Sequence, residues 1–489
     1  MPTRELPARP SLEQYKKQAK ELVKAYRSGD AGARRRVRDH HPRLARKSDA
    51  AAHHDDFSLA AAQFVIAREH GCDSWPKFIK HIEAMSGRLS PATVWRTAEE
   101  AVVAGDVATL DALLRDYGDI IRGERPQSWW NNTLTPDYEA GDARGIIAST
   151  HHFNTWDEFV AHTEAMKDNA SPVGRFEAAV DAIVGGDIAM LTRLLRDEPE
   201  LIRARSARRH HSTLLHYVGA NGVEAFRQHT PQNAVPITEV LLDAGAEVDT
   251  VADMYGGSTT LGLVATSLHP KAAGVQRPLI QLLLDRGAAL GHSAAAGGRS
   301  LVHSCLANGR PEAAAYLASR GAPLDFESAA GVGRLDVVQS FFSDEGAAKP
   351  SVTKGQMESA LMSASVYGRT AVAEFLLDRG LDVDVQVNGF TGVNAAATGG
   401  HLETIRIFLA RGASLELRNR YDGTSLEAAL WGAANRAHEA DYVPVVERLL
   451  AAGAHVDPGV VQWWRQQHAA SPEAHARILE LLRAHAGRS

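Results

Sequence analysis

A short apolar motif that contains a glycine recurs through the second half of this 489-residue chain, and it constrains the fold more than any other feature. Its copies begin at residues 241, 283, 317, 376, 409 and 449 and read LLDAGAEVD, LLDRGAAL, LASRGAPLD, LLDRGLDVD, LARGASLE and LLAAGAHVD. Successive glycines lie 42, 34, 59, 32 and 41 residues apart, and the longest interval leaves room for a degenerate copy at 329–342. Such a period predicts a stack of structural repeats.

A second motif precedes most of these copies. It reads TLLH, TTLG, SLVH, TGVN and TSLE, beginning at residues 213, 259, 300, 391 and 424. With both motifs the chain resembles ankyrin-repeat proteins, whose repeats of about 33 residues hold a β-turn, two antiparallel helices and a T-P-L-H opening. The resemblance covers roughly 175–457, and the copy at 388–416 matches it best.

The physical chemistry of one copy supports a repeat array. Leu402, Ile405, Ile407, Phe408 and Leu409 form one apolar stripe of a helix, which a single repeat cannot bury. Stacked neighbours bury such stripes, and the glycine after each second helix supplies the positive φ that ends the helix.

The first 170 residues contain a different duplication. HGCDSWPKFIKHIEAM at 70–85 matches HHFNTWDEFVAHTEAM at 151–166, and Ser-Pro pairs follow both copies. We therefore predict an all-α fold in which two related helical modules precede the ankyrin solenoid and a helical cap closes it, covering the apolar edge with Trp463 and Trp464. The boundaries predicted for these four parts are 1–90, 91–172, 173–457 (seven or eight repeats) and 458–489. The ensemble resembles bacterial ankyrin-repeat proteins.

Composition and charge exclude several classes of protein. The net charge is −6, but the first fifty residues carry +8 and the remainder −14. Only two cysteines occur, Cys72 and Cys305, and they are far apart, which indicates a reducing compartment rather than a disulfide framework. No run approaches 18 apolar residues and no secretory h-region is visible at the start, so we expect a cytoplasmic protein without a membrane span.

Histidine is concentrated in the first repeats. His216 and His303 occupy the histidine position of T-P-L-H, and the resemblance implies that their imidazoles bond to the backbone and to the hydroxyl of the repeat's threonine. That interpretation makes both residues structural.

A polar cluster in the first repeats is not explained by the repeat pattern. His210 and His211 precede the first helix near a finger turn, Tyr217 begins the inner helix, and Asp253 and Tyr255 occupy the next finger. Fingers and inner helices line the concave surface. These five residues could be a recognition patch or an ordinary solvated finger; in an enzyme, His211, Asp253 and Tyr255 would be the candidates for general acid/base catalysis.

The second candidate region is the loop RPQSWWNNTLTPDYEAGD at 125–142. Its aromatic rings either pin the loop to the module or form a stacking platform for a flat or sugar-like ligand. Insertions at 223–234, 268–277 and 433–442 could supply the walls of a pocket. The candidate binding residues in the 125–142 loop are Trp129, Trp130, Asn131, Asn132, Asp137 and Tyr138.

Motifs for nucleotide binding, a nucleophile elbow or a zinc ribbon are absent. The HHDD run at 53–56 does not have the spacing of a metal site, so we expect neither a metal nor a cofactor. The leading interpretation is a binding protein that recognises a protein partner on its concave face. The alternative is an enzyme or small-molecule binder that combines the 125–142 loop with the His/Asp/Tyr cluster. Binding of nucleic acid by the basic residues 16–47 is the least favoured.

Overall fold

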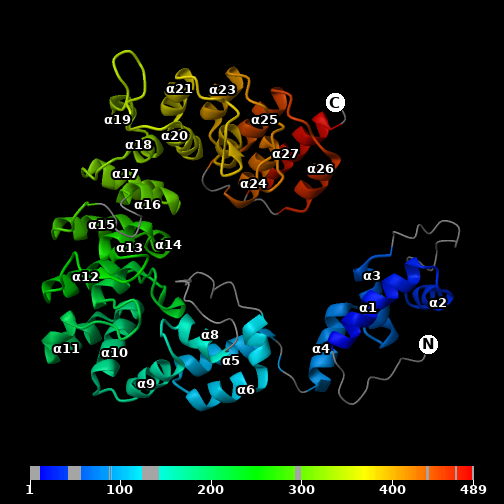
Figure 1. Ribbon diagram of the computed structural model, residues 1–489, viewed down its shortest axis with the longest axis horizontal. Coiled ribbons are helices and arrows are strands. Elements are labelled where there is room, and N and C mark those ends of the chain that lie inside the picture. The colour runs from blue at the N-terminus through cyan, green and yellow to red at the C-terminus, as the bar shows by residue number, and fades with distance from the viewer. Residues whose placement is uncertain are drawn as a thin grey trace. The chain divides into compact units, whose positions relative to one another are not determined.

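The computed structural model describes residues 12–41, 57–86, 89, 91–123, 143–291, 299–436, 440–467 and 471–486. The chain divides into two compact units, one formed by residues 1–126 with 138–146 and the other by 127–137 with 147–489. Both are helical (Figure 1). No helix in the described part of the chain is both long enough and apolar enough to cross a membrane.

The first unit is built from short amphipathic helices. Tyr15, Ala19 and Leu22 of α1 are buried against Phe57 and Phe78. Asp30 begins α2 by accepting a hydrogen bond of 2.7 Å from the amide of Ala33. The helices of this unit are α1 (Leu12–Arg27), α2 (Ala31–His40), α3 (Leu59–Glu69), α4 (Trp75–Ser86), α5 (Pro91–Val103) and α6 (Val107–Gly123), and α8 (Ala143–Thr150) contains the boundary between the units.

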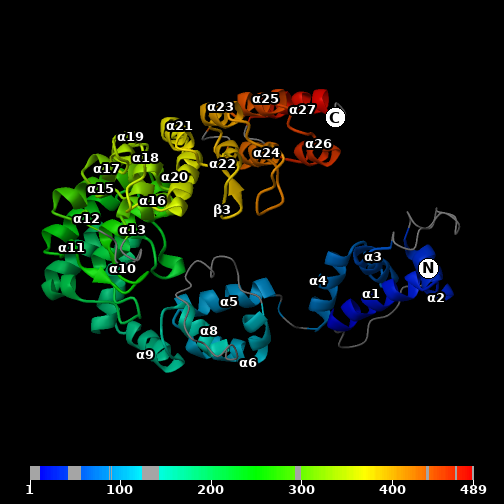
Figure 2. The same cartoon turned by 45° about the horizontal axis from the view of Figure 1, so that its top comes forward.

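The second unit begins with α9 (Trp156–Met166) and continues as stacked helix pairs (Figure 2). The pairs are α10 (Pro172–Gly185) with α11 (Ile188–Asp197), η3 (Leu214–Gly219) with α12 (Ala234–Asp243), α13 (Thr260–Thr266) with α15 (Gln276–Asp285), α16 (Leu301–Ala307) with α17 (Pro311–Ser319), α18 (Phe326–Val332) with α19 (Leu335–Ser340), α20 (Lys354–Val366) with α21 (Thr370–Asp378), α22 (Gly392–Thr398) with α23 (Leu402–Ala410), and α24 (Ser425–Asn435) with α25 (Val443–Ala451). Short segments between them are η2 (Pro199–Arg203), η4 (Ala225–Arg227) and α14 (Leu268–Ala272). The predicted helical solenoid is confirmed, and α18 with α19 is the degenerate copy expected at 329–342.

Two antiparallel hairpins form fingers of the repeats. Strand β1 (Val251–Ala252) pairs with β2 (Ser258–Thr259), with Val251 opposite Thr259. Strand β3 (Gln386–Val387) pairs with β4 (Phe390–Thr391), with Gln386 opposite Thr391.

The motifs of the sequence explain where helices start and stop. Thr391 and Asn394 form a reciprocal capping box at the start of α22. Gly380, which follows α21, has a φ of 83°, a conformation that costs glycine little. Ile405 and Phe408 of the predicted stripe are fully buried.

The described interior of the ankyrin array contains two hydrophobic clusters. The N-terminal core cluster has its buried members between Phe176 and Ala322, and the C-terminal core cluster has its members between Phe326 and Leu482. Leu324 packs against both.

The cap consists of α26 (Pro458–Arg465) and α27 (Pro472–His485). Trp464 is fully buried there, and its indole nitrogen donates to the carbonyl of His475. Trp463 remains 38% exposed, so the prediction that both tryptophans cover the last repeat holds only for Trp464.

Candidate functional site

Two of the polar residues predicted from the sequence meet between two neighbouring fingers. His211 Nδ1 lies 2.8 Å from Asp253 Oδ2, and both side chains are exposed. His211 has a positive φ of 45°, an uncommon conformation for a residue with a side chain. The guanidinium of Arg205 bonds to the carbonyls of His211 and Val251, which ties the two fingers together.

Tyr255 faces a different place. Its hydroxyl donates to Asn221 at 2.9 Å, and its ring lines a cavity of about 430 Å³. Arg299 and His303 line the same cavity, whereas His211 and Asp253 do not. The three catalytic candidates therefore do not converge on this cavity.

His210 and Tyr217 do not lie on the concave surface as predicted, because both are buried. Residues 214–219 form the 3₁₀-helix η3 rather than an α-helix, and all six are buried. The following insertion brings Glu224 beneath them: the Tyr217 hydroxyl donates to Glu224 Oε1 at 3.3 Å, and His210 Nε2 lies 3.3 Å from the same oxygen.

These contacts belong to a larger group, which we call the buried polar network. Arg208 forms ion pairs with Glu224 and, at 3.3 Å, with Glu177. Arg227 also pairs with Glu177. Burial raises the pKa of Glu224, but the positive charges of Arg208 and Arg227 and the contact with His210 together more than offset it, so the net pKa lies well below the usual range. The members of the network are His162, Glu177, Arg208, His210, Tyr217, Glu224 and Arg227.

Two further histidines border this network. Burial, followed by nearby positive charge, lowers the pKa of His151 and of His152 to about 3, so both are neutral at pH 7. The ring of His152 is 5.0 Å from that of His210. His152 has a φ of 64°, and the matching residue of the first module is Gly71 with a φ of 78°. The duplicated turn thus holds a buried histidine in a conformation better suited to glycine.

The two histidines of the repeat signature differ. His216 behaves as the resemblance implied: its Nδ1 lies 2.8 Å from the hydroxyl of Thr213 and its Nε2 lies 2.9 Å from the carbonyl oxygen of Thr250. His303 was expected to do the same, and the structure contradicts this. Its Nε2 instead lies 2.8 Å from the guanidinium of Arg299.

A second cavity lies near the C-terminal end of the array and was missed by sequence reasoning. It measures about 880 Å³, and we call it the aromatic groove. Trp431 could have indicated this groove from the sequence. It lies on α24, the first helix of its pair, and its side chain is exposed rather than packed in the core. The residues of the groove used below are Phe390, Tyr421, Asp422, Glu427, Trp431, Arg436, Asp457 and Trp463.

Several predicted residues lie outside the described residues. They include the loop residues Trp129, Trp130, Asn131, Asn132, Asp137 and Tyr138, and the HHDD run at 53–56. Of the three insertions, 223–234 contains η4 and 268–277 contains α14.

Comparison with known proteins identifies the repeats. Residues 326–419 match the family model described as ankyrin repeats (3 copies). The chain contains ankyrin repeats. It is 26% identical over 200 residues, 40% of its length, to the ankyrin repeat and KH domain-containing protein mask-1 of Caenorhabditis elegans; the match spans 7% of that protein. The human ASB11 ankyrin repeat domain is similar at 21% identity and a TM-score of 0.30, covering 56% of this chain and 96% of that one.

The aromatic groove is lined by the fingers of two repeats and by the first helix of one helix pair. Phe390 belongs to the β3–β4 finger, Tyr421 to the next finger, Trp431 to α24 and Trp463 to the cap helix α26. Ankyrin repeats in general mediate protein–protein interactions, and repeat arrays do so through extended surfaces of this kind.

Proposed function

We propose that this chain is a binding protein that recognises a protein partner on the concave face of its ankyrin array, with the aromatic groove as the anchor. The observation that carries the proposal is the exposure of Tyr421, Trp431 and Trp463, which are 74%, 47% and 38% exposed and line one cavity. Contiguous exposed aromatic side chains mark interaction sites, and tryptophan and tyrosine are enriched among the residues that dominate binding energy.

The charges of the groove indicate the chemistry of the partner. Asp422, Glu427 and Asp457 line it, and Arg436 is the only cation among the described residues that line it. The rings already accept positive charge, since Arg436 lies 5.9 Å from the centre of the Trp431 ring. A segment that offers an apolar side chain next to lysine or arginine fits both features.

The proposal includes a cytoplasmic location in a bacterium. Cys72 and Cys305 are free thiols, which suits a reducing compartment, and the resemblance of the N-terminal modules supports the proposal of a bacterial origin.

Peptide display tests the function directly. The full chain is used to select from a random peptide library, and we expect enrichment of peptides with an aromatic or aliphatic residue beside a basic one. Trp431→Ala should weaken the binding of selected peptides at least tenfold, because removing a central aromatic anchor costs about 2 kcal/mol or more.

Leu268→Ala is the matched control, because Leu268 is a similarly exposed apolar residue outside the groove. It should leave binding unchanged. Selection of the same peptides by the wild type and by Trp431→Ala would refute the groove as the anchor.

A further inference from the structure

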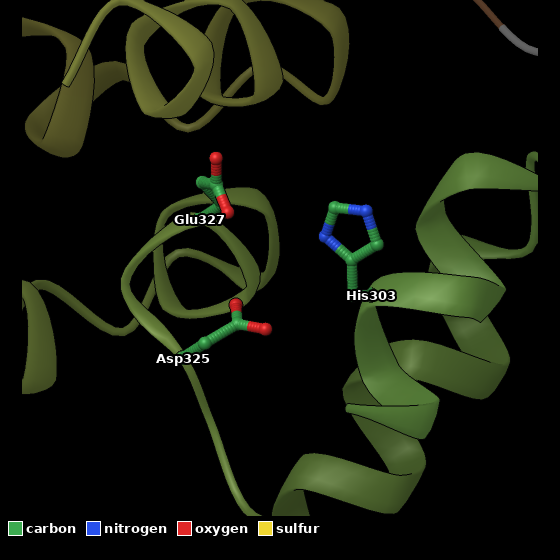
Figure 3. A group of neighbouring side chains, drawn as sticks. All are labelled: His303, Asp325 and Glu327. Carbon is green, nitrogen blue, oxygen red and sulfur yellow. The ribbon is translucent and has the colours of Figure 1, made fainter. Parts of the chain in front are cut away.

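Three side chains with metal-ligating atoms converge where two neighbouring repeats meet. His303 comes from α16, Asp325 directly precedes α18, and Glu327 lies in the first turn of α18 (Figure 3). One ligand atom from each lies within 4.8 Å of the other two. We propose that these residues form a zinc site that links the two repeats.

The three groups face one another without bonding to one another. No hydrogen bond or ion pair joins His303 to either carboxylate, although Figure 3 shows a ring nitrogen turned toward Asp325 and Glu327. Asp325 uses Oδ1 to cap α18 by accepting from the amide of Ser328 at 2.7 Å, which leaves Oδ2 available. In a tetrahedral zinc site the ligand atoms are about 3.3 Å apart, so small side-chain rotations would close the site around an ion.

His303 is available to bind a metal because its imidazole does not make the hydrogen bond to a threonine hydroxyl that His216 makes. In the repeat of His216, a threonine holds Nδ1 of the imidazole. Position 300 is a serine, and its hydroxyl lies 2.8 Å from the hydroxyl of Ser328 in the next repeat. The imidazole of His303 is therefore held by no hydroxyl of its own repeat and points across the junction instead.

The donor set favours zinc over calcium or magnesium. One imidazole nitrogen with two carboxylate oxygens is a ligand set that zinc accepts, and water can complete it because all three side chains are partly exposed. Calcium and magnesium prefer oxygen ligands alone.

Arg299 competes with the metal. Its guanidinium is always a donor, so the Nε2 atom 2.8 Å away must accept, and the proton of the neutral imidazole then resides on Nδ1. Zinc on Nδ1 needs the lone pair there, and the proton must move to Nε2, which can then no longer accept from Arg299. Zinc binding at Nδ1 therefore displaces Arg299 from Nε2.

The location gives the ion a structural role. Helix α16 belongs to the N-terminal core cluster and α18 to the C-terminal core cluster. An ion bound by both helices would join the two clusters at their junction, and a ligand that binds only the folded state raises its stability.

Isothermal titration of the chelator-treated full chain with Zn²⁺ tests the proposal, with thermal unfolding as the second readout. We expect one zinc equivalent that raises the Tm of the wild type, while Ca²⁺ leaves the Tm unchanged. His303→Ala and Glu327→Gln should each weaken this site at least tenfold and abolish the rise in Tm, and Arg299→Gln should tighten it severalfold.

His455→Ala is the matched control, because His455 is an exposed histidine remote in sequence from the site. It should bind zinc as the wild type does. Equal zinc affinity and an equal rise in Tm for the wild type and for His303→Ala would overturn the proposal. Weaker binding by Arg299→Gln would overturn the competition between the arginine and the ion.

Discussion

The two ends of the ankyrin array are built in opposite ways. At the N-terminal end, around η3, the interior contains Arg208, Arg227, Glu177 and Glu224, with charges paired out of contact with water. At the C-terminal end no charged side chain is buried among the described residues, and several aromatic side chains lie outside the core and line an open groove. Both kinds of interior are compatible with the repeat signature. The signature determines the turns and the helix pairs, whereas the residue types at the remaining positions can vary.

The difference teaches where specificity resides in each region. Buried charges need partners at defined positions, so the network fixes how η3, η4 and α10 pack on one another, with little net gain in stability. The exposed rings of the groove are not required by any repeat and are available to a partner.

Acidification should give the largest difference in stability between the two ends of the array. The pKa values of His151 and His152 in the fold are about 3, and burial lowers that of His216 to about 4, against about 6.5 in an unfolded chain. The unfolded state therefore binds protons first as the pH falls below 6.5, and stability decreases by about 1.4 kcal/mol per pH unit for each histidine.

Urea unfolding at pH 7.5 and pH 5.5 measures this loss, and hydrogen exchange locates it. We expect amides of the first repeats to lose protection before those of α22–α25. His152→Asn, which stays neutral and tolerates the positive φ, should reduce the pH dependence by about a third. Equal loss of protection at both ends would contradict the comparison.

Removal of one buried charge should come next in size. Arg208→Met leaves Glu177 and Glu224 with less compensating charge, and breaking a buried pair costs about 3–5 kcal/mol in the free energy of unfolding. Arg406→Met is the control, because Arg406 forms an exposed pair of 2.8 Å with Glu403 whose loss costs about 0.5 kcal/mol. Chemical denaturation of both variants should therefore give clearly different values. Similar values would show that the network is not held by its charges.

The smallest difference in stability is expected between alanine variants of the two neighbouring tryptophans of the cap. Trp464→Ala creates a cavity in the interior and should cost about 3 kcal/mol. Trp463→Ala removes a partly exposed ring and should cost roughly 1 kcal/mol or less, while weakening peptide binding in the groove. Thermal unfolding checks the first difference and the peptide assay the second. A larger loss of stability for Trp463→Ala than for Trp464→Ala would reverse the assignment of core and groove.

The fold was predictable because its determinants are local and repeated. Each glycine after a second helix and each threonine or serine before a first helix acts within its own repeat, as Gly380 and Thr391 show. The degenerate copy at 329–342 was found from spacing alone, since α18 and α19 keep the helix pair without the signature.

The candidate site was less predictable because it depends on contacts between distant residues. The expected proximity of His211 and Asp253 is observed because fingers of neighbouring repeats lie side by side, and a functional role for the pair stays a prediction. The prediction failed for His210 and Tyr217 because the insertion after η3 carries Glu224, and a buried carboxylate requires polar partners that the sequence pattern could not assign. His303 was misassigned for a similar reason: Arg299 bonds to its ring.

The division of the array into two core clusters has a mechanical consequence. Buried members of one cluster end at Ala322 and those of the other begin at Phe326, so we expect hydrophobic cohesion to be weakest at the short segment between them. A repeat array pulled from its two ends yields where neighbouring repeats hold each other least. We expect stretching to open the array in two main steps, each releasing about 500 Å of polypeptide, with the first break at the segment that contains Leu324.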